Sequence, residues 1–235
     1  MGKYFKRFEN HSQYEQYIQS ENYIKPNISV CDNEQEIHYN TLFTSHKYVD
    51  LGLPSGTLWA TENIKDSSGN DLYFAWGETQ GYAAKQVGID KIFNWEHYRF
   101  GTSNNLTKYN STDGKTTLDT SDDAATVLWG SNWCIPTKEN FQELIDNTTT
   151  AWTTEGKTGI TFTSTINGNS VFFPALGNAD YIGVNGVGEN GLFWSRSLYA
   201  DNVDKAWYFY FGSEVGMWQY NRYEGYLVFP VRANN

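Results

Sequence analysis

Short apolar runs separated by turn residues make up most of this chain, and the clearest of them lies near the C-terminus. In Ala206-Trp207-Tyr208-Phe209-Tyr210-Phe211, every residue after the first is aromatic, which is typical of a β-strand. Side chains of a strand point alternately to opposite faces, so Trp207, Phe209 and Phe211 are expected on an apolar core face. Tyr208 and Tyr210 then share the other face, which can lie at the surface. The 21 Gly and five Pro also favour a turn-rich fold over a helical bundle.

The chain from residue 47 onward continues this pattern and adds two helix candidates. Asp122 and Asp123 can cap a helix over residues 124–128. A second helix is expected over residues 137–145, with Phe141, Leu144 and Ile145 on one face. Residues 159–164 and 170–173 flank the turn Asn167-Gly168-Asn169 and predict a hairpin, whereas residues 101–121 predict an exposed loop. Further strands are expected at residues 191–195, 206–211, 216–219 and 226–231. The predicted class is α+β, with short antiparallel strands and two helices.

Residues 1–46 have a different pattern and are expected to form a small module of their own. Tyr14, Tyr17 and Ile18 have helical spacing after a capping-box sequence, which predicts a helix over residues 12–20. A strand-like start precedes this helix, and two further strands are expected at residues 28–31 and 36–39. Such a β-α-β-β module has too little core to be secure alone, so we expect it to pack on a partner or on its own copies. The expected domains are therefore residues 1–46 and 47–235.

The charge and the distribution of apolar residues argue against nucleic-acid binding, membrane insertion and export. With 17 basic and 27 acidic residues the formal net charge is −10, and no stripe of Lys or Arg is present to follow a phosphate backbone. We therefore expect no nucleic-acid partner. No segment approaches 18 consecutive apolar residues and the start has no apolar signal-peptide region, so neither membrane insertion nor export is expected.

Six blocks of the large domain, spread over residues 47–232, resemble a single family. They are Tyr48–Thr61 (YVDLGLPSGTLWAT), Tyr73–Thr79 (YFAWGET), Asp122–Ala125 (DDAA), Trp129-Gly130 with Trp133–Thr137 (WCIPT), Phe193–Ser195 (FWS) and Val228–Arg232 (VFPVR). This set resembles the Fibrobacter succinogenes major paralogous domain, which is common in gut Bacteroidetes and their phages. The resemblance implies a fold related to the C-type-lectin-like and formylglycine-generating-enzyme-like folds. The chain departs from the pattern at Glu62, where many members carry Cys.

The N-terminal segment resembles a short module at the start of virion proteins of crAss-like and related phages. The residues that carry this second resemblance are Phe8-Glu9, Tyr14-Glu15, Tyr17-Ile18, Pro26–Ser29 and Ile37–Asn40. It implies that residues 1–46 dock on other virion proteins. It would also explain the missing export signal, since virion proteins assemble in the host cytoplasm and leave by lysis. The expected location is the virion.

The sequence gives little support for catalysis, metal or cofactor. The formylglycine-generating relatives use a cysteine pair, but Cys134 has only Cys31, in the other module, as a companion. We therefore expect Cys134 to be a buried, inert thiol and the protein to be no enzyme. The four His residues lack metal-ligand spacing, and Asp122 and Asp123 already have a role at a helix N-terminus. No metal, cofactor or catalytic residue is predicted.

The segment from residue 194 to 224 is the strongest candidate for a binding surface. Tyr, Trp and Arg interspersed with Ser, Gly and Asn are typical of binding hot spots and paratopes. In lectin-like folds used by phage diversity-generating systems, this region carries the variable binding residues. The alternative is that the same rings pack the core or an interface between copies. The predicted ligand-binding residues are Arg196, Tyr199, Asp201, Asn202, Tyr208, Tyr210, Glu214, Trp218, Tyr220, Asn221, Arg222 and Tyr223.

Together these observations predict a phage virion structural protein, a head or tail fibre or decoration protein. Its lectin-like domain would bind a glycan or protein of the host surface, and many copies on one particle would multiply a weak affinity. Proteins of this kind are usually closed homo-oligomers, and a trimer is favoured over a dimer. A non-enzymatic bacterial surface adhesin of the same domain family is the alternative.

Overall fold

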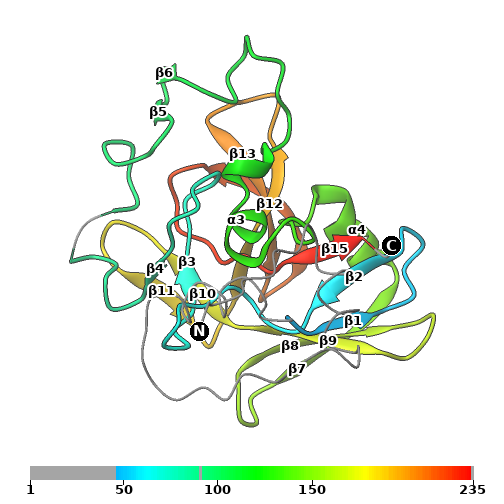
Figure 1. Cartoon of the computed structure of the whole chain (residues 1–235). Helices are drawn as coiled ribbons and strands as arrows, with labels where there is room; N and C mark the ends of the chain where they lie inside the picture. Colours follow the sequence, from blue (N-terminus) through cyan, green and yellow to red (C-terminus); the bar gives the residue numbers. More distant parts are fainter. Residues whose placement is uncertain (1–45, 90–91, 234–235) are drawn as a thin grey trace, which may run out of the picture. The chain divides into compact units, whose positions relative to one another are not determined.

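The computed structural model describes residues 46–89 and 92–233 of the chain. By its contacts the chain divides into two units, Met1–Phe43 and Thr44–Asn235. The β-α-β-β module expected in residues 1–46 lies outside the described residues, except for residue 46, and stays a prediction. The second unit carries the whole of the structure described below (Figure 1).

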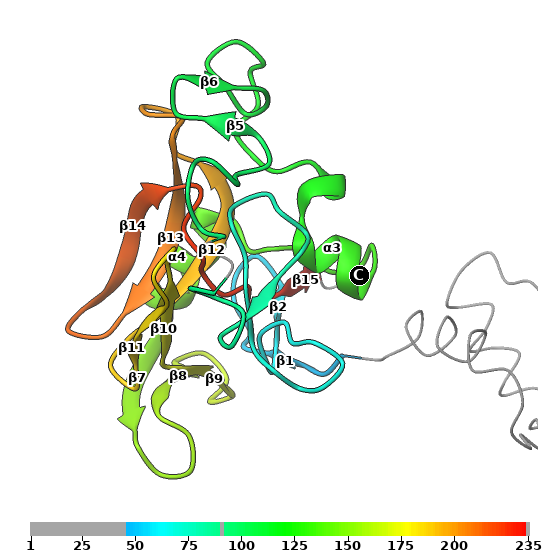
Figure 2. The ribbon, with the colours of Figure 1, turned by 90° about the vertical axis from the view of Figure 1, so that its left-hand side faces the viewer.

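The largest sheet of this unit has five strands in the order β11-β10-β12-β13-β14. All of its neighbouring strands are antiparallel except β10 and β12, which pair in parallel. Figure 2 shows the β13–β14 hairpin on one side of the unit and the helix α3 on the other. The strands are β10 (Leu176–Ala179), β11 (Val184–Val187), β12 (Gly191–Leu198), β13 (Lys205–Phe211) and β14 (Val215–Asn221).

Two three-stranded sheets complete the main framework. One is a meander of β7 (Thr148–Thr153), β8 (Gly159–Ser164) and β9 (Ser170–Pro174). In the other, β2 (Thr57–Ala60) lies between β1 (Tyr48–Asp50) and β15 (Val231–Ala233), so the first and last strands of the unit flank the same neighbour (Figure 1). Two small pairs remain, β3 (Leu72–Tyr73) with β4 (Tyr82–Ala83) and β5 (Gly101–Thr102) with β6 (Asn105–Leu106).

The two predicted helices form close to their expected ranges, and each begins at a capping residue. After the short 3-10 turn η1 (Thr120–Asp122), α3 spans Ala124–Trp129 and its N-cap Asp123 accepts a hydrogen bond from the Thr126 N–H. The helix α4 spans Lys138–Asp146, and its N-cap Thr137 exchanges hydrogen bonds with Asn140 in a capping box. Phe141 and Leu144 are buried, so the predicted apolar face of α4 is confirmed.

Stacked phenylalanines from different elements fill the centre of the unit. Phe173 of β9 stacks on Phe229 with ring centroids 3.9 Å apart, and Phe141 of α4 stacks on Phe209 of β13 at 4.8 Å. Trp59 of β2 packs at an angle against three of these rings. Aromatic rings bury large apolar areas, so this core stabilises the fold although aliphatic residues are few.

The paired strands β10 and β11 approach each other closely at one glycine. Gly177 has φ +64°, a left-handed conformation that favours glycine, and a Cβ added there would lie 1.7 Å from the Asn185 carbonyl oxygen. Gly168, in the β8–β9 turn, has φ +80° but no atom within 4 Å of the position of such a Cβ. Gly177 therefore combines a left-handed backbone with close packing, whereas Gly168 has the left-handed backbone alone.

At the coarse level the predicted class is confirmed, because the unit is mostly β, with short antiparallel sheets and two helices. The hairpin expected around residues 167–169 is β8–β9, and the strands expected at 191–195, 206–211 and 216–219 are parts of β12, β13 and β14. Phe209 and Phe211 are buried as expected, whereas Trp207 is only half-buried.

Two sequence expectations were wrong. Residues 226–231 do not form one strand, because their hydrogen bonds go to separate neighbours: Tyr226 to Phe74, Leu227 to Leu192 and Val228 to Ile64, before β15 begins at Val231. Residues 101–121 are not simply an exposed loop either. Tyr109 and Leu118 are anchored in the core with exposures of 0% and 2%, and β5 pairs with β6 in the same segment.

Candidate functional site

The β13–β14 hairpin brings the predicted aromatic residues onto one face of the large sheet. Its register is unbroken from Lys205–Asn221 to Phe211–Val215, with Tyr208 opposite Trp218 and Ala206 opposite Tyr220. Directly opposed residues of antiparallel strands lie on the same face, and so do residues two apart along one strand. Tyr208, Tyr210, Trp218 and Tyr220 therefore form one surface, called here the aromatic face.

The aromatic face is partly open to solvent. Trp218 and Tyr220 expose 43% and 45% of their surface, and Tyr208 and Tyr210 are half-buried. Burial, followed by the neighbouring Tyr210, Tyr220 and Glu224, raises the pKa of the Tyr208 phenol to about 12. This coupling shows that the polar ends of these side chains lie close to one another. The Tyr208 phenol is neutral at ordinary pH, and a phenol hydroxyl can both donate and accept hydrogen bonds.

Buried rings lie beside the aromatic face, on the same side of the sheet. Trp194 of β12, 1% exposed, stacks on Tyr226 at 4.2 Å, and Tyr226 contacts the Tyr208 ring at 4.8 Å. The Trp194 indole N–H donates to the Phe74 carbonyl at 2.7 Å. Tyr208 is therefore held by packed neighbours, whereas Trp218 and Tyr220, which are more exposed, are better placed to contact another molecule.

A buried carboxyl group lies beside the aromatic face. Glu224 is only 8% exposed, and burial, followed by the nearby charge of Asp180, raises its pKa to about 7. The turn after β14 carries Glu224 back toward β10, where the Gly225 and Ala179 backbones exchange two hydrogen bonds of 2.7 and 2.8 Å. The prediction of site residues missed Glu224, because nothing in the sequence shows that this acidic residue folds inward.

Three predicted residues lie in the connection from β12 to β13. Asp201 and Asn202 are exposed, and the backbone there is closed by a hydrogen bond from the Asn202 N–H to the Tyr199 carbonyl. The half-buried Tyr199 packs edge-on against Trp207, whose other contact is the Lys138 ammonium, 4.0 Å from the ring centroid. Trp207 belongs to the opposite face of the sheet from Tyr208, so this group is separate from the aromatic face.

The remaining surface residues lie at opposite ends of the hairpin. Asn221, at the end of β14, donates from its side chain to the Tyr223 hydroxyl at 3.3 Å, and Tyr223 packs on Trp95 at 5.0 Å. Glu214 is exposed in the β13–β14 turn. Seven residues of β13 separate the two ends, which corresponds to about 20 Å at the usual rise of a strand. The predicted residues thus do not converge on one compact pocket.

Arg222 is not a ligand-binding residue, and this prediction is corrected. The side chain is 0% exposed and lies among the rings of Trp76, Tyr98, Phe100 and Tyr109. Its guanidinium donates to the Tyr98 hydroxyl and to the carbonyls of Lys108, Tyr109 and Val203 at 2.9 to 3.2 Å. All of these contacts are internal, so Arg222 ties the 98–109 segment to the end of β14.

Arg196 also faces the interior rather than a ligand. Its side chain is 21% exposed, donates to the Leu118 carbonyl at 2.8 Å, and lies 3.8 Å from the buried carboxylate of Asp123. Burial raises the pKa of Asp123, although its carboxylate accepts hydrogen bonds from the Thr126 and Ile135 N–H groups. Arg196 is therefore a structural partner of the α3 cap, and its role in ligand binding stays a prediction.

The described residues show no arrangement that would assign catalysis. Burial raises the pKa of the half-buried Cys134 thiol, and the charge of Asp123 adds to the effect. Less of the thiol is therefore in the reactive thiolate form. Within residues 46–89 and 92–233, no three His, Cys, Asp or Glu side chains are grouped as metal ligands would be. Asp122 accepts hydrogen bonds from Lys108 and Tyr109 and so has structural partners. Cys31 lies outside the described residues.

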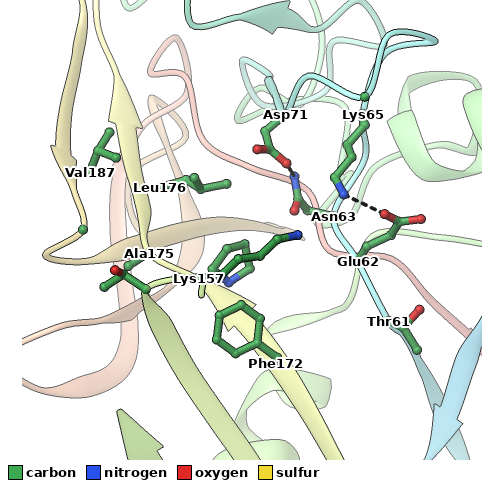
Figure 3. Close-up of a pocket in the computed structure, with 14 residues that line it drawn as sticks. Thr61, Glu62, Asn63, Lys65, Asp71, Lys157, Phe172, Ala175, Leu176 and Val187 are labelled. Atoms are coloured by element: carbon green, nitrogen blue, oxygen red, sulfur yellow. Dashed lines mark hydrogen bonds and ion pairs between the residues drawn. The ribbon is translucent and has the colours of Figure 1, made fainter. Parts of the chain in front are cut away.

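Sequence reasoning missed a second candidate site altogether. A hollow of about 470 Å³ lies where residues 61–71, 157–158, 172–176 and 187–188 meet, and Figure 3 shows side chains that line it. Its polar lining comes chiefly from Glu62, Asn63, Lys65, Asp71 and Lys157, and Phe172 provides an aromatic wall. No local motif marks these positions, because the site exists only once four distant segments have come together.

Comparisons with known proteins identify no relative of this chain. No family model, no curated protein and no solved structure matches it. In the part of the chain that the structure describes, no helix has both the length and the apolar composition to span a membrane.

Proposed function

We propose that this chain is a structural protein of a phage virion, and that its large domain has a C-type-lectin-like fold and binds a glycan or protein on the host surface. The observation that carries the binding proposal is the aromatic face, where Trp218 and Tyr220 present nearly half of their surface to solvent on a rigid two-stranded support. Large rings with a polar edge contribute much contact area and lose little conformational entropy on binding.

The packing around the aromatic face supports a binding role over a purely structural one. A ring needed only for the core would be covered, as Trp194 and Phe209 are at 1% and 0% exposure. Trp218 and Tyr220 instead lie on the outermost strand of the sheet, with Tyr208 and Tyr210 beside them. Exposed aromatic residues grouped in this way are typical of binding surfaces.

The proposed lectin-like fold is supported by the location of the residues that carry the family resemblance. Trp59, Trp76, Trp133 and Trp194, one from each of four sequence blocks, are all at most 5% exposed. The Trp76 indole donates to the Ser195 carbonyl at 2.8 Å, and Trp194 donates to Phe74, so two blocks are hydrogen-bonded to each other. The residues that carry the resemblance therefore pack in the core, as expected of residues that define a fold.

The virion assignment is supported by the resemblance of residues 1–46 to modules of phage virion proteins. In this proposal the N-terminal module docks on a neighbouring virion protein, the chain forms a closed homo-oligomer, and the aromatic face meets the host. Many copies on one particle would raise the apparent affinity of a weak single site.

The binding proposal is tested with the fluorescently labelled full chain and a panel of gut Bacteroidetes strains, measured by flow cytometry. The double variant Trp218→Ala with Tyr220→Ala should lower binding to any strain that the unmodified chain labels by about tenfold or more, as expected when two hot-spot rings are lost. The matched control is Trp152→Ala with Tyr48→Ala, which removes the same residue types at similar exposures, 42% and 50%, from β7 and β1, outside the large sheet.

Loss of binding in the control as well, or failure of the unmodified chain to label any strain, would overturn the host-binding proposal. Melting temperatures of both double variants separate loss of contact from loss of folding. Mass spectrometry of purified phage particles from a culture that carries this gene tests the virion assignment independently, and detection of the chain on bacterial surfaces but not in particles would favour the adhesin.

A further inference from the structure

The hollow beside Asp71 has the dimensions of a small-molecule site. Its volume of about 470 Å³ lies within the usual range for ligand pockets, about 300–1,000 Å³. A second hollow of about 450 Å³ shares four lining residues with it, Gly69, Asp71, Leu176 and Val187, and reaches Tyr73 and Lys85. The two hollows therefore adjoin at these shared residues.

Backbone hydrogen bonds hold the walls of this hollow in place. The Ala175 N–H donates to the Thr158 carbonyl at 2.9 Å, and the Gly188 N–H donates to the Ala175 carbonyl at 2.8 Å. On the opposite wall, the turn before Asp71 is closed by hydrogen bonds from the Asn70 backbone and side chain to the Asp66 carboxylate at 2.9 and 2.8 Å. A ligand would therefore enter a site that is largely formed in advance.

One side of the hollow is apolar. Phe172 of β9 lines it together with Leu176 and Val187, and Val187 is 59% exposed (Figure 3). The Phe172 ring lies over Gly159, where an added Cβ would come within 2.7 Å of the ring. Phe172 points away from the core face of its sheet, which is occupied by its neighbour Phe173, 0% exposed. The ring is thus available as a platform for a flat apolar surface.

The other side of the hollow is polar and carries both signs of charge. The Asn63 side chain, 2% exposed, donates to the Asp71 carboxylate at 3.0 Å, and the Lys65 ammonium pairs with the Glu62 carboxylate at 2.7 Å. In Figure 3 the exposed Lys157 extends its amine toward the side that holds Asn63 and Glu62. Two carboxylates and two ammonium groups thus alternate around the space.

This combination selects the chemistry of the ligand. The two carboxylates and two ammonium groups give this lining no net charge, so an anion or a cation meets as many repelling as attracting side chains. A neutral molecule with many hydroxyl groups can donate hydrogen bonds to the carboxylates and accept them from the ammonium groups. If one of its faces is lined with C–H groups, that face can lie against the Phe172 ring.

We infer that this hollow binds a short neutral carbohydrate of one or two sugar rings. Pyranose rings combine an apolar C–H face with a rim of hydroxyl groups, which matches the Phe172 wall and the Asp71–Lys157 side. The inference does not depend on the proposed function, because no residue of the hollow belongs to the aromatic face. A failure of one proposal leaves the other intact.

Saturation-transfer difference NMR on the full chain tests this inference with four neutral probes: cellobiose, maltose, lactose and N,N′-diacetylchitobiose. At least one should bind with a Kd near or below about 1 mM, which is typical of small single-site ligands. Phe172→Ala and Asp71→Asn should each weaken that binding by about tenfold, since each removes one of the two recognition elements. Glucuronate and glucosamine, which carry a charge, should bind more weakly than the neutral probes.

Trp152→Ala is the matched control, because Trp152 pairs through Ile160 with Phe173 and therefore lies on the opposite face of that sheet from Phe172. It should leave sugar binding within about twofold, a difference well below that of a lost contact. If Phe172→Ala fails to fold, Asp71→Asn and Lys157→Ala decide the question. The inference is overturned if none of the four neutral probes binds, if the charged probes bind as well as the neutral ones, or if the variants of the hollow bind like Trp152→Ala.

Discussion

Replacing Glu224 by Gln should stabilise the large domain above pH 7 and have little effect near pH 4. In the folded chain the pKa of Glu224 is about 7, against an ordinary value of 4.5, because the carboxyl group is buried beside Asp180. Each pKa unit corresponds to about 1.4 kcal/mol, so ionising this group in the folded state costs about 3 kcal/mol at pH 8. The stabilisation that Glu224 contributes as a neutral acid is fully present below pH 4.5 and is lost as the pH rises through 7.

Urea unfolding of both proteins at pH 4, 6 and 8 measures this effect. The variant should gain up to about 3 kcal/mol over the unmodified chain between pH 4 and pH 8, because Gln does not ionise. The quantity compared is the difference in unfolding free energy between the variant and the unmodified chain. A hydrogen bond that the glutamine side chain gains or loses equally at both pH values does not change how this difference varies with pH. Glu214→Gln, at an exposed position in the β13–β14 turn, is the control and should show no such trend. A Glu224→Gln difference that is the same at pH 4 and pH 8 would refute the assignment of a buried, neutral carboxyl group.

Two further predictions concern internal contacts and are measured by the same urea denaturation. Arg222→Ala should lower the free energy of unfolding by about 4 kcal/mol, because it opens a cavity among four rings and leaves three carbonyls without their donor. Its control, Arg99→Ala, removes a side chain that is 50% exposed and should cost no more than about 1 kcal/mol. Gly177→Ala should cost about 3 kcal/mol, because it adds backbone strain and a collision with the Asn185 carbonyl. Its control, Gly168→Ala, adds the strain alone and should cost about 1 kcal/mol. Equal losses for the two glycine variants would show that β10 and β11 can separate to make room.

The parts of the fold that depend on local chemistry were predictable from the sequence. Asp123 caps α3 as expected, because a capping side chain acts within three residues of its own position, and α4 begins one residue after the predicted start at Thr137. The β8–β9 hairpin follows from its turn residues for the same reason. The β13 strand was predictable because its alternation of aromatic residues spans the whole strand.

The features that depend on distant segments were not predictable. Arg222 resembles a surface residue in a Tyr- and Asn-rich segment, yet its partners are residues 98–109, more than a hundred positions away. Residues 226–231 have the composition of a strand, but each contacts a different neighbour. The hollow beside Asp71 is the extreme case, since four separate segments build it.

The position of β2 between β1 and β15 has a consequence for how the domain is made. The last described strand, Val231–Ala233, hydrogen-bonds to a strand that begins at Thr57, so this sheet can close only after residues 57–233 have left the ribosome. Until then one edge of β2 stays unpaired, and the phenylalanine stack lacks Phe229. Synthesis must therefore pass Ala233 before the domain can complete its core, and termination before that point would leave an aromatic-rich intermediate prone to aggregation.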